Sequence, residues 1–273
     1  IKDHYFKDGK VVEKKTQVAV KDLEAVAKKE NAPFVCVFYR LLLEITPRAT
    51  SSEHHYIVLR VMNERGAEML ASLHCRTMAV GWGMDVKVKQ ANVIRRDGTV
   101  EEGRVSFGSV SFSNLCAGDT LVISFRADER AAEQSRFFGD YYGQIIFLNP
   151  TGRLRRFFFS VASDLMPVKF SKLVLVLPKE DVRKIHIYAK GVKEKATAEA
   201  GVDAKTRVLV WRLKDLPLVT SEDHMPPMEQ VTPNIQVSTF YDWKEFGKWL
   251  WGLIRKQHGG SEKLRAKVAE LIK

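Results

Sequence analysis

The sequence has little cysteine and no long apolar run. Its three cysteines, Cys36, Cys75 and Cys116, lie far apart and form no Cys-x-x-Cys pair. An odd number of widely spaced cysteines argues against a zinc ribbon or a disulfide framework, and at most one bridge could form. No apolar stretch approaches the roughly 18 residues that cross a membrane, so we expect no membrane span.

The chain also lacks the short motifs of common enzyme classes. It contains no glycine-rich phosphate loop, no Gly-x-Ser-x-Gly and no His-Glu-x-x-His. The histidines show no metal-site spacing, and the adjacent His54 and His55 of a predicted strand point to opposite faces, where they cannot share one ion. We therefore expect no cofactor, no metal site and no catalytic residue in this chain.

Acidic residues are fewer than basic ones. The 33 Asp and Glu residues against 44 Lys and Arg leave a net charge of +11. This excess favours a polyanion as ligand, such as an acidic glycan, a cell-wall polymer or nucleic acid, and binding that weakens with salt. No run of Lys and Arg reaches the length of a basic tail, so a solvated basic surface is the simpler interpretation.

The residue pattern predicts an all-β fold, an antiparallel β-sandwich of about ten strands. Residues 34–45 are almost continuously apolar, which is typical of a strand buried on both faces. Residues 84–94 alternate strictly, so one side of that strand faces water, and Arg95-Arg-Asp-Gly98 predicts a tight hairpin turn. The other strands are expected at 54–62, 99–107, 120–127, 144–148, 154–161, 169–177, 184–189, 207–213 and 235–239.

Short elements complete the predicted module. A hairpin that turns at Asp8-Gly9 is expected within residues 1–20, followed by a helix over 22–30. Asn63-Glu-Arg-Gly66 is interpreted as a turn. Residues 190–206 are interpreted as an exposed hairpin tip or loop, with a short helix as the alternative.

A tryptophan-rich helix is predicted to begin at Asp242. Asp242 can cap this helix, and Glu245 can reach back to the amide of the cap in a variant of the capping box. At ~100° per residue its apolar side chains share one broad face, with Trp251 at the margin. The residues of this face that we assign to docking are Trp243, Phe246, Trp249, Leu250 and Trp251.

This apolar face has two interpretations: it packs on the core of the sandwich, or it contacts another domain. We expect part of it, Trp249 to Trp251, to be exposed or buried against another copy. The same expectation holds for a second helix after Ser261, which carries an apolar stripe. The residues of that stripe are Leu264, Val268, Leu271 and Ile272.

Two further features are candidates for chemistry. A cysteine nucleophile needs a thiolate at a helix N-terminus beside a histidine, whereas Cys116 lies in a loop before a predicted strand. Cys36 and Cys75 lie inside strand-like runs, so we interpret all three cysteines as structural. The second feature is a basic and aromatic strand at 153–159, which either binds anions or places its phenylalanines in the core. The candidate anion-binding residues are Arg153, Arg155 and Arg156.

The order of several segments resembles a known family. Pro233-Asn-Ile-Gln-Val-Ser-Thr239, followed by Asp242-Trp243, is similar to the end of the bacterial domain-of-unknown-function family 3857. That family commonly precedes a transglutaminase-like domain of the cysteine peptidase superfamily. Further matching segments lie at 61–66, 91–100, 115–119 and 167–178, so the resemblance covers roughly residues 54 to 254.

The resemblance implies a domain organisation and a role. Residues 1–240 would form a β-sandwich module, with a family-like core at about 54–240, and residues 241–273 a helical lead-in to a following domain. Since the chain starts at Ile1 rather than Met, we expect a piece of a longer precursor. Its partner would be the downstream transglutaminase-like domain, which would hold the catalytic residues, in a periplasmic or extracytoplasmic location.

The module itself would be non-catalytic and would serve in substrate or partner binding. An alternative is a stand-alone extracytoplasmic binding module for acidic glycan or cell-wall polymer. A nucleic-acid binder ranks behind both interpretations.

Overall fold

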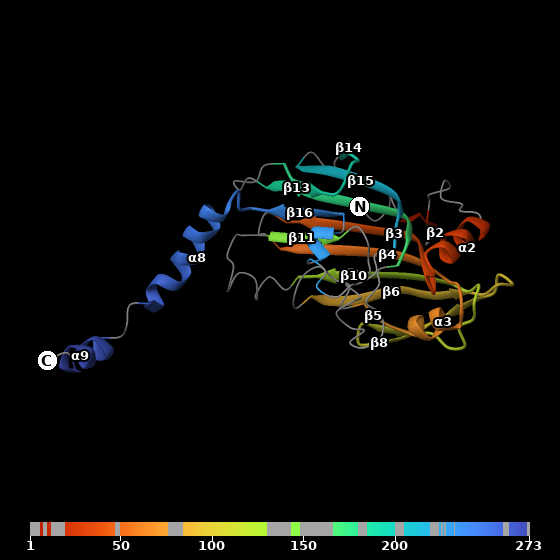
Figure 1. Ribbon diagram of the computed structural model, residues 1–273, viewed down its shortest axis with the longest axis horizontal. Coiled ribbons are helices and arrows are strands. Elements are labelled where there is room, and N and C mark those ends of the chain that lie inside the picture. Colours follow the sequence, from red (N-terminus) through yellow and green to blue (C-terminus); the bar gives the residue numbers. More distant parts are fainter. Residues whose placement is uncertain are drawn as a thin grey trace.

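The computed structural model is mainly β-structure. It describes residues 6–7, 10–11, 20–46, 50–75, 84–129, 143–147, 166–179, 185–199, 205–218, 224, 226, 228–231, 233–258 and 262–271. The strands of its largest sheet are β3 (Phe34–Ile45), β4 (Ser51–Val61), β6 (Asp85–Ile94), β7 (Val100–Glu102), β10 (Thr120–Asp128), β12 (Val168–Pro178), β14 (Thr197–Glu199) and β15 (Thr206–Leu216). Their order across the eight-stranded sheet is β14-β15-β12-β3-β4-β10-β6-β7 (Figure 1).

The pairing within this sheet is antiparallel except at its centre. There β12 runs parallel to β3, with Leu173 opposite Leu41 and Leu175 opposite Leu43. The prediction of a strand buried on both faces at β3 is confirmed, because nearly every residue of it is buried. Continuous apolar sequence is typical of strands in a parallel pair, since both of their faces are covered. The sheet is therefore mixed, where a purely antiparallel arrangement was predicted.

Two small sheets and a hairpin accompany the large sheet. Their strands are β1 (Phe6–Lys7), β2 (Lys10–Val11), β5 (Ser72–His74), β8 (Arg104–Ser106), β9 (Ser109–Ser111), β11 (Gly143–Phe147), β13 (His186–Lys190) and β16 (Asn234–Ser238). One small sheet has the order β11-β16-β13 and the other β5-β9-β8. Strands β1 and β2 pair as an antiparallel hairpin, with Lys7 opposite Lys10, so the predicted hairpin is confirmed, and the turn predicted at Asp8-Gly9 lies outside the described residues.

The core lies between the large sheet and the two small sheets. Leu41 and Ile123 from the large sheet join Ile235 of β16 and Leu73 of β5 in one buried cluster. Burying an aliphatic side chain of this size contributes roughly 1.5–3 kcal/mol. The predicted sandwich is confirmed as a mainly β fold, and the described residues form more strands than the ten or so expected.

The described part of the chain contains five helices, of which one, α3 (Glu64–Leu70), was not predicted. The other four are α2 (Val20–Lys29), α7 (Met228–Val231), α8 (Trp243–His258) and α9 (Glu262–Leu271). The predicted helix at 22–30 corresponds to α2, which buries Leu23 and Ala27 against Val35 of β3. Figure 1 shows α8 and α9 leading away from the sheets rather than lying on them. No helix among the described residues is both long and apolar enough to cross a membrane.

The missed helix is α3 (Glu64–Leu70), which begins where a turn was predicted. The Asn63 side chain accepts a hydrogen bond of 2.9 Å from the Gly66 N–H and so caps the helix. The same asparagine can begin a turn or a helix, and here the buried side chain of Leu70 favours the helix. Gly66 is needed because a Cβ at this position would lie 2.0 Å from the Pro33 carbonyl oxygen.

Other local predictions have mixed outcomes. The turn at 95–98 is confirmed: the Arg95 N–H donates to the Thr99 carbonyl at 2.8 Å, and Gly98 has a φ of 89°. The strand predicted at 99–107 is divided, since β7 pairs with β6 whereas β8 pairs with β9.

The segment 190–206 was interpreted as a tip, a loop or a helix, but it contains β14, which pairs with β15. The strand predicted at 154–161 lies outside the described residues.

Candidate functional site

The start of α8 is fixed by two reciprocal hydrogen bonds. The Asp242 carboxylate accepts from the Glu245 N–H at 2.8 Å, as the predicted cap requires. The Glu245 carboxylate accepts from the Tyr241 N–H at 2.8 Å, so the return bond lies one residue before the predicted one at Asp242. This geometry sets the direction in which the helix leaves β16.

An aromatic cluster ties the first turns of α8 to Phe240, which lies two residues after the end of β16. The Phe240 ring lies 5.4 Å from Phe246 and 5.2 Å from Trp249, measured between ring centroids. Trp243 packs edge-on against Phe246 at 5.6 Å, and Phe246 lies 5.5 Å from Trp249. Aromatic pairs of this geometry contribute roughly 0.5–1.5 kcal/mol each beyond their burial. The structure therefore brings together three of the five residues assigned to docking.

Much of the helix surface remains exposed. Trp243 is 82% exposed and Trp251 is 56% exposed, and Leu250 is also exposed. Phe246 and Trp249 are half-buried by the aromatic cluster. Val268 and Leu271 of α9 are exposed as well. The expectation of an exposed surface on α8 and α9 holds for Leu250, Trp251, Val268 and Leu271, whereas Trp249 is partly covered. The side chains of Leu264 and Ile272 lie outside the described residues. Exposed aromatic residues are the type most often found at the centre of protein interfaces.

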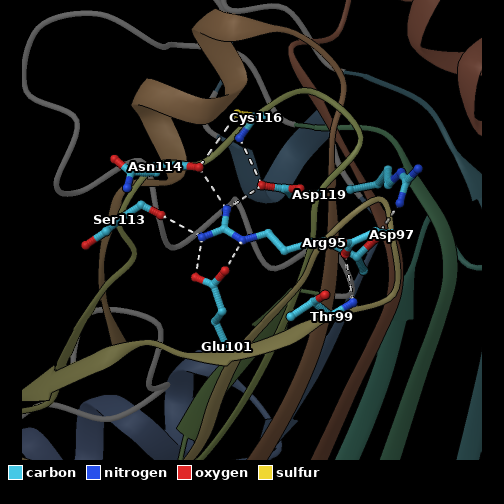
Figure 2. Close-up of polar contacts among 10 residues, drawn as sticks. Arg95, Asp97, Thr99, Glu101, Ser113, Asn114, Cys116 and Asp119 are labelled. Carbon is cyan, nitrogen blue, oxygen red and sulfur yellow. Dashed lines mark hydrogen bonds and ion pairs between the residues drawn. The ribbon is translucent and has the colours of Figure 1, made fainter.

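Cys116 lies in a loop that is held together by Arg95 (Figure 2). The Arg95 guanidinium donates to Asp119 at 2.7 Å, to the Asn114 carbonyl at 2.8 Å and to the Ser113 carbonyl at 3.0 Å. It also forms a two-point ion pair with Glu101, which raises the pKa of Arg95 and lowers that of Glu101. The loop connects β9 to β10 in the chain, and the Arg95 contacts hold it against the turn that follows β6.

The thiol of Cys116 lacks the surroundings of a nucleophile. The Cys116 N–H donates to Asp119 at 2.9 Å, and the thiol donates to the Asn114 carbonyl at 3.7 Å. The residue is exposed and precedes a strand rather than a helix. The Asp119 carboxylate accepts from Arg95 and from the Cys116 backbone amide, so its role in the described structure is to hold the loop.

The other two cysteines are buried. Burial raises the pKa of Cys75 to about 12 and raises the pKa of Cys36 still further. A thiol with so high a pKa remains protonated at neutral pH and is a poor nucleophile. These surroundings support the structural interpretation of both residues.

A buried acid–base pair was missed by the sequence reasoning. Glu53 and His55 of β4 point into the core, with a Glu53 carboxylate oxygen 2.7 Å from His55 Nε2. The His55 ring stacks on Phe125 with centroids 4.3 Å apart, and the Tyr39 hydroxyl lies 3.4 Å from His55 Nδ1. The available signal was Glu-x-His, because residues two apart on a strand share a face.

His54 lies on the opposite face of the sheet, as predicted from the alternation of the strand. Partial burial, with the Arg126 charge nearby, lowers the pKa of His54 to about 4. Among the described residues no group of three or more His, Cys, Asp or Glu side chains is arranged to hold a metal ion. The candidate anion-binding residues Arg153, Arg155 and Arg156 lie outside the described residues.

Comparisons with known proteins locate the fold among solved structures. No family model and no curated protein sequence matches the chain. A putative protease from Parabacteroides distasonis ATCC 8503 superposes with a TM-score of 0.58 at 12% identity, over 87% of this chain and 45% of that one. This likeness shows the fold alone.

A second solved structure is less similar. An M1 zinc metallopeptidase from Deinococcus radiodurans gives a TM-score of 0.38 at 12% identity, over 75% of this chain and 42% of that one. That score is too low to establish a shared fold. The chain spans less than half the length of either protein.

Proposed function

We propose that this chain is a non-catalytic β-sandwich accessory module that packs on a transglutaminase-like domain of the same precursor and serves in substrate or partner binding. The proposal rests on the exposed aromatic side chains of α8. The start of this helix is held next to the end of β16 by the Asp242 cap and by the packing of Phe240. The sequence resemblance to the family that precedes such domains gives the identity of the partner.

The position of the aromatic residues supports a docking role. Trp243 and Trp251 present large apolar surfaces to water at the edge of the module. Monomeric proteins rarely expose contiguous apolar patches without a binding role. Because the cap and the Phe240 cluster fix the start of α8, the helix is held in place before a partner binds, which lowers the entropy cost of association.

The fold comparison is compatible with such a role. The superposed protease chain extends well beyond the part that this chain covers. In our proposal the catalytic cysteine, histidine and aspartate lie in the following domain, and the sandwich contributes binding surface.

We predict that the chain itself has no transamidase, peptidase or esterase activity. Cys36 and Cys75 are buried, and Cys116 precedes a strand and has no hydrogen bond to a histidine among the described residues, whereas a nucleophile needs a base to activate it. The assay is ammonia release from a glutamine donor, together with hydrolysis of generic peptide and ester substrates. Activity that disappears in Cys116→Ala would overturn the non-catalytic assignment.

The proposal is tested by producing the two parts separately. We expect this chain and the transglutaminase-like domain of its precursor to co-elute in size-exclusion chromatography as a one-to-one complex. A matched control replaces Lys248, an exposed residue of α8 outside the apolar face, with alanine and should co-elute as the native chain does. Separate elution of the two native parts, or a precursor without such a domain, would contradict the proposal.

A further inference from the structure

A second exposed surface lies on the small sheet β11-β16-β13. Ile235 and Val237 of β16 are buried in the core, so strand alternation places Gln236 on the outer face. β13 pairs with β16 so that Tyr188 lies opposite Gln236 and His186 opposite Ser238. Gln236, Ser238, Tyr188 and His186 therefore share one face, which we call the outer face of the small sheet.

Aromatic rings are exposed on this face. Tyr188 is 61% exposed, and Tyr241, just before α8, is 76% exposed. The Tyr241 ring packs edge-on against His186, with centroids 5.1 Å apart and planes at 63°. Tyr241 is thereby held beside the strand that carries Tyr188. The face of an aromatic ring carries partial negative charge, which attracts the electropositive C–H groups of a sugar ring.

The charge of the sheet has one sign. The residues of β11, β13 and β16 include no Asp or Glu, whereas β13 carries Lys190. The segment after β13 adds the exposed Lys193 and Lys195 beside a single Glu194. Together with the net charge of +11, this composition is complementary to an anionic ligand.

We infer that the outer face of the small sheet binds an acidic polysaccharide, a chain of sugar rings that carry carboxylates. Tyr188 and Tyr241 stack on the sugar rings. The Gln236 amide donates to Asn234 Oδ1 at 3.3 Å, and its second N–H and its carbonyl oxygen can donate to and accept from sugar hydroxyls. Lys190 lies on the same strand as Tyr188 and attracts the carboxylates.

Single-stranded nucleic acid is the competing polyanion. Bases also stack on aromatic rings, but two-point contacts to a phosphate group come from arginine, whose planar fork matches it. The three strands of the small sheet contain no arginine, and β16 and β13 place the half-buried Gln236 and Ser238 beside Tyr188 on this face. This composition favours a hydroxyl-rich sugar polymer. The inference does not depend on the docking role of α8.

The test is affinity electrophoresis of the purified chain in gels that contain polygalacturonate, dextran as a neutral polymer, or single-stranded DNA. We expect retardation by polygalacturonate alone, which weakens when the salt is raised, because added ions screen exposed charges. Tyr188→Ala and Gln236→Ala should each weaken binding, the tyrosine variant by about tenfold, as for the loss of one stacking residue. Thermal unfolding that matches the native chain confirms that both variants are folded.

The controls separate this face from other basic surfaces. Phe107 is 97% exposed on the β8–β9 hairpin of the other small sheet, so Phe107→Ala should leave retardation unchanged. Three results would overturn the inference: no retardation by polygalacturonate, stronger retardation by DNA, or unchanged binding in Tyr188→Ala. A further variant replaces Arg153, Arg155 and Arg156 with alanine. If this variant loses binding while Tyr188→Ala binds as the native chain does, the arginines form the binding site instead.

Discussion

Replacing Glu53 with alanine is expected to lower the free energy of unfolding by about 1–3 kcal/mol, because it removes one side of a buried hydrogen bond and the other group has already lost its contact with water. The Glu53 and His55 side chains are both fully buried and 2.7 Å apart. The stacked ring of Phe125 and the nearby Tyr39 hydroxyl keep His55 in place in the core. Urea unfolding followed by circular dichroism measures the change.

Two variants make this result specific to the pair. Glu102→Ala removes an exposed carboxylate from β7 and should change stability by less than about 0.5 kcal/mol. The double variant Glu53→Met with His55→Leu removes both polar groups and should recover much of the lost stability, since replacing both partners of a buried hydrogen bond by apolar groups of similar shape can be nearly neutral. A Glu53→Ala variant as stable as the native chain would show that the pair contributes nothing to the fold.

Replacing Trp251 with alanine is expected to weaken the complex with the transglutaminase-like domain by about 2 kcal/mol or more, the effect of losing an aromatic residue at the centre of an interface. The free energy of unfolding of the isolated chain should change by less than about 0.5 kcal/mol, because the side chain is largely exposed. Calorimetric titration of the two parts measures the first quantity and urea unfolding the second.

Trp211 provides the matched comparison for a tryptophan of the core. It is buried in β15 next to the central strands, so Trp211→Ala should cost the isolated chain about 3–5 kcal/mol. If Trp251→Ala instead destabilises the isolated chain by a similar amount, Trp251 belongs to the module's own packing and its docking role is wrong.

Local patterns account for what could be predicted from the sequence. Continuous apolar residues identified β3, strict alternation identified β6, and Asp-Gly placed the turn at Gly98. The start of α8 was predictable because a cap depends on residues within one turn of each other. Each of these features is decided by neighbours in the chain.

Features that depend on distant residues were missed. The parallel pairing of β3 with β12 joins residues more than a hundred positions apart, and no local pattern encodes it. The helix α3 was read as a turn because Asn63 suits both, and the close approach to Pro33 that requires Gly66 is a tertiary contact. The exposed face formed by Tyr188, Gln236 and Tyr241 depends on the pairing of β13 with β16.

Amide hydrogen exchange of the intact precursor tests the docking of α8 most directly. Slow exchange requires that a helix be held by its surroundings, so the α8 amides beyond the Phe240 cluster, residues 250–258, should exchange fast in this chain alone and far more slowly in the precursor. The central strands β3 and β12 should be equally protected in both and serve as the internal reference. Equal exchange of α8 in the two proteins would contradict its role as the helix that packs on the catalytic domain.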